Sequence, residues 1–173
     1  MFPFFAIVAG VGMSKFVGLF KKEKLLVVFI VVAVFLFSFE SYFTDFLTKY
    51  PKNSARDWQY GYEKIFENYS ASFDKYQKII ISDEYAQPYI FALFYQKINP
   101  TEFRKTATYN PVDNWGFSTI KSFDNFIFKK ITAEDLQKDT LVFATNMDKI
   151  ENVEPGGKIL NPDGSTSFWV YSK

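Results

Sequence analysis

The chain has 173 residues, which is enough for one domain of ordinary size and a smaller segment. It contains no cysteine and no histidine, which excludes disulfides, Ser–His and Cys–His catalytic systems and histidine metal sites. The formal net charge of +1, without a dense lysine or arginine face, argues against nucleic-acid binding. We therefore expect no cofactor and no metal site, and any chemistry would fall to carboxylates, Lys, Arg or Tyr.

The first 39 residues are almost wholly apolar and carry an excess of positive charge, +3 against −2 for the rest of the chain. Residues 25–39 are uncharged, and the segment 25–43 approaches the roughly 20 residues that span a bilayer. Basic residues before it and aromatic residues after it are typical of a transmembrane helix. A cleavable signal peptide is not favoured, because no small-x-small cleavage site follows the apolar run.

A second apolar stretch, residues 1–20, contains three glycines, which are common in membrane helices. We interpret it as a second, imperfect membrane helix, although Lys15 is costly near the middle of a bilayer. The basic loop 21–24 joins the two helices and is predicted to be cytoplasmic. Residues 50–173 are then expected to form a domain outside the cytoplasm, and the lipid bilayer is the first expected partner.

The soluble part opens with a helix signal. Residues 50–53 contain Pro51 and predict a break after the membrane segment. Ser54, followed three positions later by Asp57, predicts an N-cap and its partner at the start of a helix over residues 55–69. Gly61 lies on the apolar face of this helix and indicates close packing against a sheet. The face is completed by residues at helical spacing, namely Trp58, Tyr62, Ile65, Phe66 and Tyr69.

The centre of the domain is a strand, a turn and a buried helix. The β-branched run 79–81 predicts a strand buried on both faces, and Pro88 predicts the first turn of a helix that continues to residue 95. Gln87, just before the proline, is expected to be extended. Ligands bind at the carboxyl ends of strands in open α/β sheets, so we expect substrate contacts at Ser82, Asp83, Glu84, Tyr85 and Gln87. The alternative is that the polar residues of this turn cap the helix that follows.

The rest of the chain continues this alternation. Asn99 and Pro100 predict a short helix to about residue 105, and residues 106–116 are predicted to be a loop. A strand over 125–129, a short helix capped by Thr132 and Asp135, and a buried strand over 141–144 follow. The turn 161–164 is predicted to join strands 158–160 and 168–171 as a hairpin. The expected fold is an α/β sheet of two or three layers with a C-terminal β-hairpin, preceded by one or two transmembrane helices.

A resemblance rests on five short segments: Tyr50-Pro51, residues 56–62, residues 79–82, residues 88–91 and Phe94-Tyr95. With these, the stretch 42–100 resembles the C-terminal region of bacterial polytopic glycosyltransferases of the C superfamily, which are similar to dolichyl-phosphate-mannose–protein mannosyltransferases. The resemblance implies that the domain caps a membrane cavity where a polyprenyl-phosphate sugar meets an acceptor. It also implies that the turn 82–87 contributes acceptor contacts.

The same resemblance implies no catalytic residue here. The catalytic carboxylate of that family lies in the first extracytoplasmic loop, far upstream of the matching region, so the chain is expected to be the tail of such an enzyme. Two other functions stay open: a free-standing membrane-anchored interaction or assembly module and, least favoured, an extracytoplasmic hydrolase. The aromatic residues near the turn could form a sugar-stacking surface or belong to the core, and they are Trp58, Tyr60, Tyr62, Tyr85 and Tyr89.

Overall fold

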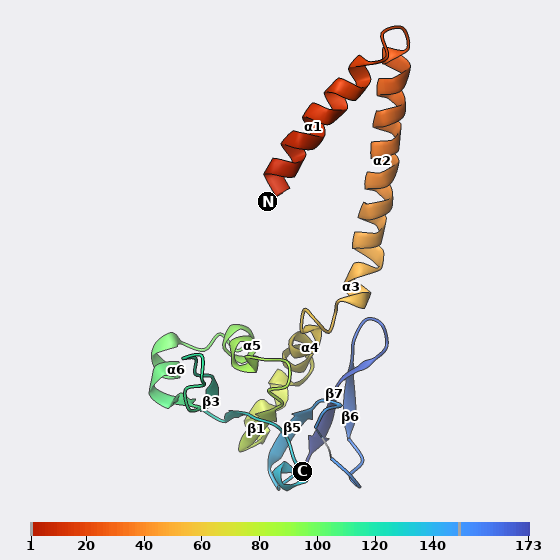
Figure 1. Ribbon diagram of the computed structural model, residues 1–173. Helices are drawn as coiled ribbons and strands as arrows, with labels where there is room; N and C mark the ends of the chain where they lie inside the picture. Colours follow the sequence, from red (N-terminus) through yellow and green to blue (C-terminus); the bar gives the residue numbers. More distant parts are fainter. Residues whose placement is uncertain (1, 149) are drawn as a thin grey trace. The chain divides into compact units, whose positions relative to one another are not determined.

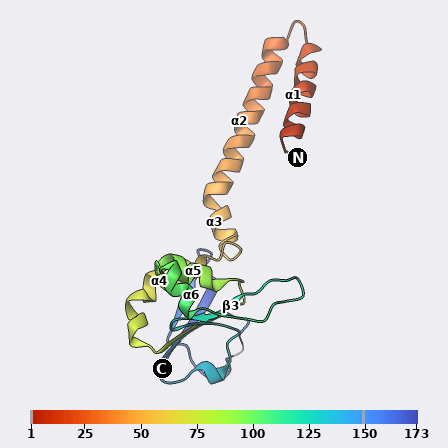
Figure 2. The ribbon, with the colours of Figure 1, turned by 90° about the vertical axis from the view of Figure 1, so that its left-hand side faces the viewer.

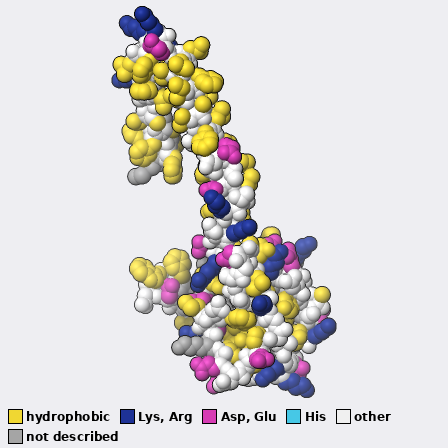
Figure 3. Space-filling model, turned by 90° about the vertical axis from the view of Figure 1, so that its right-hand side faces the viewer, with side chains coloured by type: hydrophobic (Ala, Val, Ile, Leu, Met, Phe, Trp, Pro, Cys, Tyr) yellow, Lys and Arg dark blue, Asp and Glu magenta, His cyan; other side chains and the backbone are white. Residues whose placement is uncertain are grey.

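The computed structural model describes residues 2–148 and 150–173, and the chain divides into two compact units, residues 1–50 and 51–173. The first unit is a hairpin of two helices, α1 (Phe2–Gly18) and α2 (Lys24–Thr48), joined by a tight loop (Figure 1). None of the described residues in either helix is buried. Hydrophobic side chains cover the visible face of both helices, and the lysines gather at the loop (Figure 3).

The helix α2 is long and apolar enough to cross a membrane, and it is the one such helix among the described residues. Its 25 residues extend the predicted segment 25–43 by one residue at the start and by five residues at the end. These features fit both a membrane anchor and a signal sequence near the N-terminus. The helix α1 is apolar but has only 17 residues, which is at the lower limit of the length needed to span a bilayer.

The prediction that residues 50–53 interrupt the helical structure after the membrane segment is wrong. Residues Tyr50–Asn53 make a short helix, α3, because Pro51 sits in its first turn, where a missing N–H leaves no hydrogen bond unmade.

The second unit contains a mixed sheet of seven strands in the order β2-β3-β4-β1-β5-β7-β6, which confirms the α/β class. The central strand β1 pairs in parallel with β4 and β5, and the outer pairs are antiparallel. Gly164 has a φ of 85° in the turn between β6 and β7. The strands are β1 Lys78–Ile81, β2 Thr108–Tyr109, β3 Ile120–Phe123, β4 Phe126–Phe128, β5 Thr140–Ala144, β6 Gly157–Leu160 and β7 Thr166–Ser172.

Three α-helices and a 3₁₀ helix cover one face of this sheet (Figure 2). They are α4 (Tyr60–Tyr69), η1 (Ser70–Lys75), α5 (Pro88–Tyr95) and α6 (Pro100–Thr106). Tyr62, Ile65 and Phe66 of α4 pack against the strands in an aromatic core. The opposite face carries Ile80, Val142 and Tyr171, and it is covered by loops and the short helix η2 (Ala133–Asp135). The domain therefore has two layers of regular structure.

Several elements lie where the local sequence pattern predicts them. Ile79, Ile80 and Ile81 are at most 4% exposed, which confirms the strand buried on both faces. The Asn99 side chain accepts a hydrogen bond from the N–H of Thr101 at 2.8 Å and begins α6 as predicted. Thr132 and Asp135 form the predicted capping box of η2. The two short strands β2 and β3 were not predicted.

The first helix of the domain begins later than predicted. Residues 54–59 form turns, and α4 starts at Tyr60, because Gln59 takes a left-handed conformation with a φ of 57°. Ser54 is thus not the N-cap, and Trp58, which is 69% exposed, is not on the core face. The packing predicted for Gly61 is confirmed: a Cβ atom there would lie 1.9 Å from the Ser167 hydroxyl oxygen of β7.

Candidate functional site

The three parallel strands β4, β1 and β5 end at one edge of the sheet, and the segments that follow them lie side by side. The N–H of Ser82 donates to the carbonyl of Phe143 at 3.0 Å, and the N–H of Lys129 donates to the carbonyl of Ile81 at 3.3 Å. We call this place the carboxyl edge. Open α/β sheets bind ligands at the carboxyl ends of their strands. The carboxyl edge contains the turn 82–87, where substrate contacts were predicted.

Ser82 is a structural residue of this edge. It is fully buried, and the Tyr62 hydroxyl donates a hydrogen bond to its carbonyl at 3.1 Å. Its own hydroxyl accepts the N–H of Glu84 at 3.4 Å. Burial also raises the pKa of Tyr62, so this phenol stays protonated and remains a donor. Ser82 therefore fixes the start of the turn and presents no group to a ligand in solution.

Asp83 and Glu84 lie next to each other on the exposed part of the turn. Although the Asp83 side chain reaches solvent, loss of surrounding water raises the pKa of its carboxyl group above the usual 3.8. The negative charges of Asp148 and Glu84 act in the same direction, and the Lys130 ammonium opposes them. A partly desolvated carboxyl group after the end of a strand can accept a hydrogen bond from a hydroxyl group or, once protonated, donate one to it.

Tyr85 is half-buried, and Arg56 covers it. The Tyr85 ring packs edge-on against Tyr62 and Phe168, with centroids 6.3 and 5.6 Å apart. The Arg56 guanidinium carbon lies 5.6 Å from the centre of the Tyr85 ring, within the range of a cation–π contact. Burial raises the pKa of Tyr85, and the positive charge of Arg56 counteracts part of that rise. Arg56 thus places five N–H donors beside the turn that carries Asp83 and Glu84.

The turn does not cap the helix that follows it. The helix α5 begins at Pro88 as predicted, but within the described residues no side chain caps its first N–H groups. Gln87 is not extended: Ala86 and Gln87 have φ values of 55° and 50°. Two successive non-glycine residues in this region store backbone strain, which is tolerated where the surrounding fold fixes it and is frequent at functional turns. Gln87 is exposed beside this strained backbone.

Asp148 is a residue of the edge that the sequence reasoning missed. Its carboxylate accepts the N–H of Ile131 at 2.9 Å and the N–H and hydroxyl of Thr145 at 2.7 and 2.9 Å. It thus ties the segment after β4 to the segment after β5. A signal existed, because Thr145 and Asp148 have the spacing that identified Thr132 and Asp135 as a capping box.

The aromatic residues near the turn do not form one stacking surface. Tyr62 is fully buried and belongs to the core, where it stacks on Phe91 with centroids 4.8 Å apart. Tyr85 and Tyr89 also pack against that core. Tyr60 contacts the ammonium of Lys64, 5.2 Å from its ring centre. The core interpretation therefore holds for Tyr62, Tyr85 and Tyr89, and Tyr85 also lies in the turn at the carboxyl edge.

The polar residues that lie at the carboxyl edge are Arg56, Asp83, Glu84, Tyr85 and Gln87, and they form the candidate site. Within residues 2–148 and 150–173, no group of three or more Asp, Glu, His or Cys side chains could hold a metal ion. Comparison of the chain with protein-family models, curated proteins and solved structures finds no match. The resemblance of residues 42–100 to C-superfamily glycosyltransferases therefore stays a prediction.

Proposed function

We propose that this chain is the membrane-anchored, extracytoplasmic C-terminal module of a glycosyltransferase that uses a polyprenyl-phosphate-linked sugar. In this proposal α2 anchors the chain in the cell membrane, and the carboxyl edge of the α/β domain binds the acceptor. One observation carries it: a helix apolar enough to cross a membrane precedes an α/β domain in which the turn after the central parallel strand carries Asp83 and Tyr85, with Arg56 against the Tyr85 ring. The resemblance of residues 42–100 supports the same function.

The edge suits an acceptor rich in hydroxyl groups. Carboxylates accept hydrogen bonds from hydroxyl groups, and the Arg56 guanidinium donates to their oxygens. Arg56 is held over Tyr85 and the turn is fixed by the hydrogen bonds of Ser82, so little side-chain ordering is needed on binding. We assign acceptor binding to these residues and no catalytic step to any residue of the chain.

The orientation is tested with a reporter fused after Lys173. Alkaline phosphatase folds to its active form outside the cytoplasm, so this fusion should be active, and a fusion after Lys22 should be inactive. The loop 21–24 carries three of the lysines on which this orientation depends. The opposite pair of results would place the domain in the cytoplasm and exclude the proposal.

The function itself is tested in the organism that encodes the chain. Deletion of its gene should remove one class of glycosylated lipid or protein from the membrane fraction, as measured by mass spectrometry. The wild-type gene should restore that product, and the double variant Arg56→Ala, Asp83→Asn should not. Lys64→Ala, which removes an ion pair with Glu67 on the helix α4, is the matched control and should restore it fully.

A second candidate function, an interaction module, is favoured by the loop between β2 and β3. This loop extends from the domain (Figure 2) and exposes three large apolar side chains, Val112, Trp115 and Phe117, at 67%, 85% and 71%. Grouped exposed apolar residues mark interaction sites. If the gene deletion leaves every glycan unchanged, and Trp115→Ser with Phe117→Ser disrupts a membrane complex that contains the chain, this second function replaces the first.

A further inference from the structure

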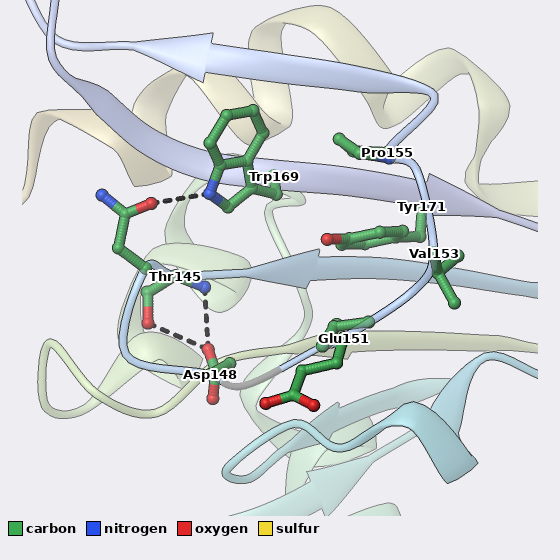
Figure 4. Close-up of a pocket in the computed structure, with 9 residues that line it drawn as sticks. Thr145, Asp148, Glu151, Val153, Pro155, Trp169 and Tyr171 are labelled. Atoms are coloured by element: carbon green, nitrogen blue, oxygen red, sulfur yellow. Dashed lines mark hydrogen bonds between the residues drawn. The ribbon is translucent and has the colours of Figure 1, made fainter.

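A pocket of about 460 Å³ lies on the sheet face opposite the helices, between β5, β7 and residues 145–148 and 150–155 (Figure 4). Its volume falls in the range of roughly 300–1,000 Å³ that small-molecule sites occupy. Apart from Asp148, its residues differ from those around the turn 82–87. Local sequence patterns do not identify this pocket, because its residues come from two separate segments of the chain, the one after β5 and the strand β7.

The apolar wall of the pocket comes mainly from one strand. Trp169 and Tyr171 are two residues apart on β7, so their rings project from the same face of the sheet. Val153 and Pro155 border the same space from the loop, and Figure 4 shows the two rings and Pro155 around it. Aromatic rings of this kind provide a flat apolar surface on which a ring-shaped ligand can stack.

Tyr171 contributes a phenol hydroxyl to the pocket. The residue as a whole is only 7% exposed. Figure 4 shows this hydroxyl directed into the space between Trp169, Thr145 and Glu151. Because this hydroxyl faces the pocket, it can donate a hydrogen bond to a ligand or accept one from it. Because burial also raises the pKa of Tyr171, this phenol is a donor at neutral pH.

Two further polar groups face the pocket. The side-chain amide oxygen of Asn146 accepts a hydrogen bond from the indole N–H of Trp169 at 2.6 Å. This bond orients the indole and leaves the side-chain N–H₂ of Asn146 as a donor. Glu151 is exposed, and its carboxylate is an acceptor at the opposite side of the opening. Asp148 plays a different part, since its two oxygens are already bonded to Ile131 and Thr145.

We propose that this pocket binds a neutral sugar residue. A sugar ring presents an apolar C–H face for Trp169, and each of its hydroxyl groups both donates and accepts, which matches the donors of Tyr171 and Asn146 and the acceptor of Glu151. A cationic ligand would leave the two donors unmatched, and an anionic ligand would meet the charge of Glu151. This site goes beyond the proposed function, because it requires neither a lipid-linked donor nor the carboxyl edge.

The test uses the full chain in detergent micelles or nanodiscs and reads the fluorescence of Trp169. The sequence contains three tryptophans, Trp58, Trp115 and Trp169, so the double variant Trp58→Phe, Trp115→Phe leaves Trp169 as the only emitter. The probes are methyl glycosides of glucose, galactose, mannose and N-acetylglucosamine, with tetramethylammonium chloride as the cationic probe. At least one glycoside should give a saturable change in Trp169 emission, and tetramethylammonium should give none.

Two variants locate the binding. In the same background, Tyr171→Phe and Glu151→Gln should each weaken glycoside binding by roughly 2- to 10-fold, the loss expected for one hydrogen bond. Tyr109→Phe, a change to an exposed tyrosine of β2, is the matched control and should bind like the parent. The proposal is overturned by a saturable response to tetramethylammonium alone, by no response to any glycoside, or by unchanged affinity in both pocket variants. Because the carboxyl edge is intact in all of these proteins, none of these failures bears on the acceptor site.

Discussion

The carboxylate of Asp148 accepts a hydrogen bond from the backbone N–H of Ile131, 17 positions earlier in the chain, at 2.9 Å. Its other oxygen accepts the N–H and hydroxyl of Thr145. Both segments follow parallel strands, β4 and β5, that flank β1. One side chain therefore holds together the loops that follow β4 and β5 and also lines the pocket that contains Trp169.

Asp148→Ala should strongly destabilise the domain. The substitution removes a charged acceptor and leaves the N–H groups of Ile131 and Thr145 buried without partners. Hydrogen bonds to a charged group contribute about 1.5–3 kcal/mol each, so we expect a loss of roughly 2–4 kcal/mol after partial relaxation. The measurement is the free energy of unfolding in urea, followed by circular dichroism of the purified chain.

Asp113→Ala is the matched control for this prediction. Asp113 also accepts two backbone N–H groups, those of Trp115 and Phe117 at 2.8 and 2.9 Å, but in an exposed loop where water can replace it. Its loss should cost less than about 1 kcal/mol, since exposed N–H groups find water as a partner. Equal losses in the two variants would show that Asp148 does not fasten the two segments as described.

Gly61→Ala should destabilise the domain although alanine favours helix. Gly61 is in the first turn of α4, where alanine normally gains about 1 kcal/mol over glycine. Here the new Cβ would lie 1.9 Å from the Ser167 hydroxyl oxygen and 2.8 Å from a Phe168 ring carbon. Overpacking of this kind costs roughly 1–3 kcal/mol, so the net change should be a loss, measured as a lower melting temperature.

Gly156→Ala separates this steric effect from the general effect of adding a methyl group. A Cβ on Gly156 would have its nearest neighbours at 3.8 Å, an ordinary contact distance, so the variant should melt close to the parent. A Gly61→Ala protein as stable as the Gly156→Ala protein would contradict the close packing of α4 on β7.

Elements with local signals could be predicted from the sequence. The run Ile79–Ile81 has no polar alternation, which only a strand covered on both faces tolerates. Asn99 and Thr132 each stand where a side-chain oxygen can accept an N–H within the next three residues. Residues close together in the chain determine this strand and these helix caps, so they could be predicted without knowledge of tertiary contacts.

The late start of α4 and the strands β2 and β3 required tertiary information. Ser54 and Asp57 have the spacing of a helix cap, but the chain between them forms turns. The helix α4 begins only after Gln59, which adopts a left-handed conformation. The strand β3 has a polar pair, Lys121 and Ser122, between its buried ends, and β2 has only two residues. Neither gives a periodic pattern long enough to identify.

The candidate sites were predictable only where one segment carried them. The turn 82–87 was found because strand, turn and proline are contiguous in the chain. Arg56 reaches Tyr85 from 29 positions away, and Asn146 bonds to Trp169 from 23 positions away. Such pairs depend on the order of strands in the sheet, which the local sequence pattern does not specify.

Lysines in the middle of α2 should prevent stable insertion of the chain in a membrane. Val32→Lys with Leu36→Lys adds two charges where each costs about 2.5–3.5 kcal/mol on insertion scales. The wild-type chain should remain in the membrane pellet after alkaline carbonate extraction, and this double variant should be released. Leu25→Lys with Leu47→Lys places the charges near the ends of the helix, where they can reach the interface. This control should stay in the pellet, and its release would show that α2 does not act as an anchor.

Asp83→Asn should stabilise the domain at neutral pH. The pKa of Asp83 is raised in the folded chain by loss of water and by the charges of Asp148 and Glu84, with Lys130 opposing. The folded state therefore binds more protons than the unfolded state in the window above the usual pKa of 3.8, so ionisation of Asp83 lowers stability as pH rises. Asparagine removes that penalty, and its advantage should fade as pH falls below this window.

Asp163→Asn should show the opposite sign in the same titration. Hydrogen bonds from the hydroxyl and N–H of Ser165 lower the pKa of Asp163, so its ionised form adds stability that is lost as pH falls through the lowered pKa. The asparagine variant should therefore melt below the parent at neutral pH and approach it in acid. Melting temperatures of parent and variants, measured from neutral to acidic pH, compare the two positions directly. If Asp83→Asn melts below the parent at neutral pH, a partner at the carboxyl edge stabilises the Asp83 carboxylate. The proposal that Asp83 is a partly desolvated group available to bind the acceptor substrate would then be wrong.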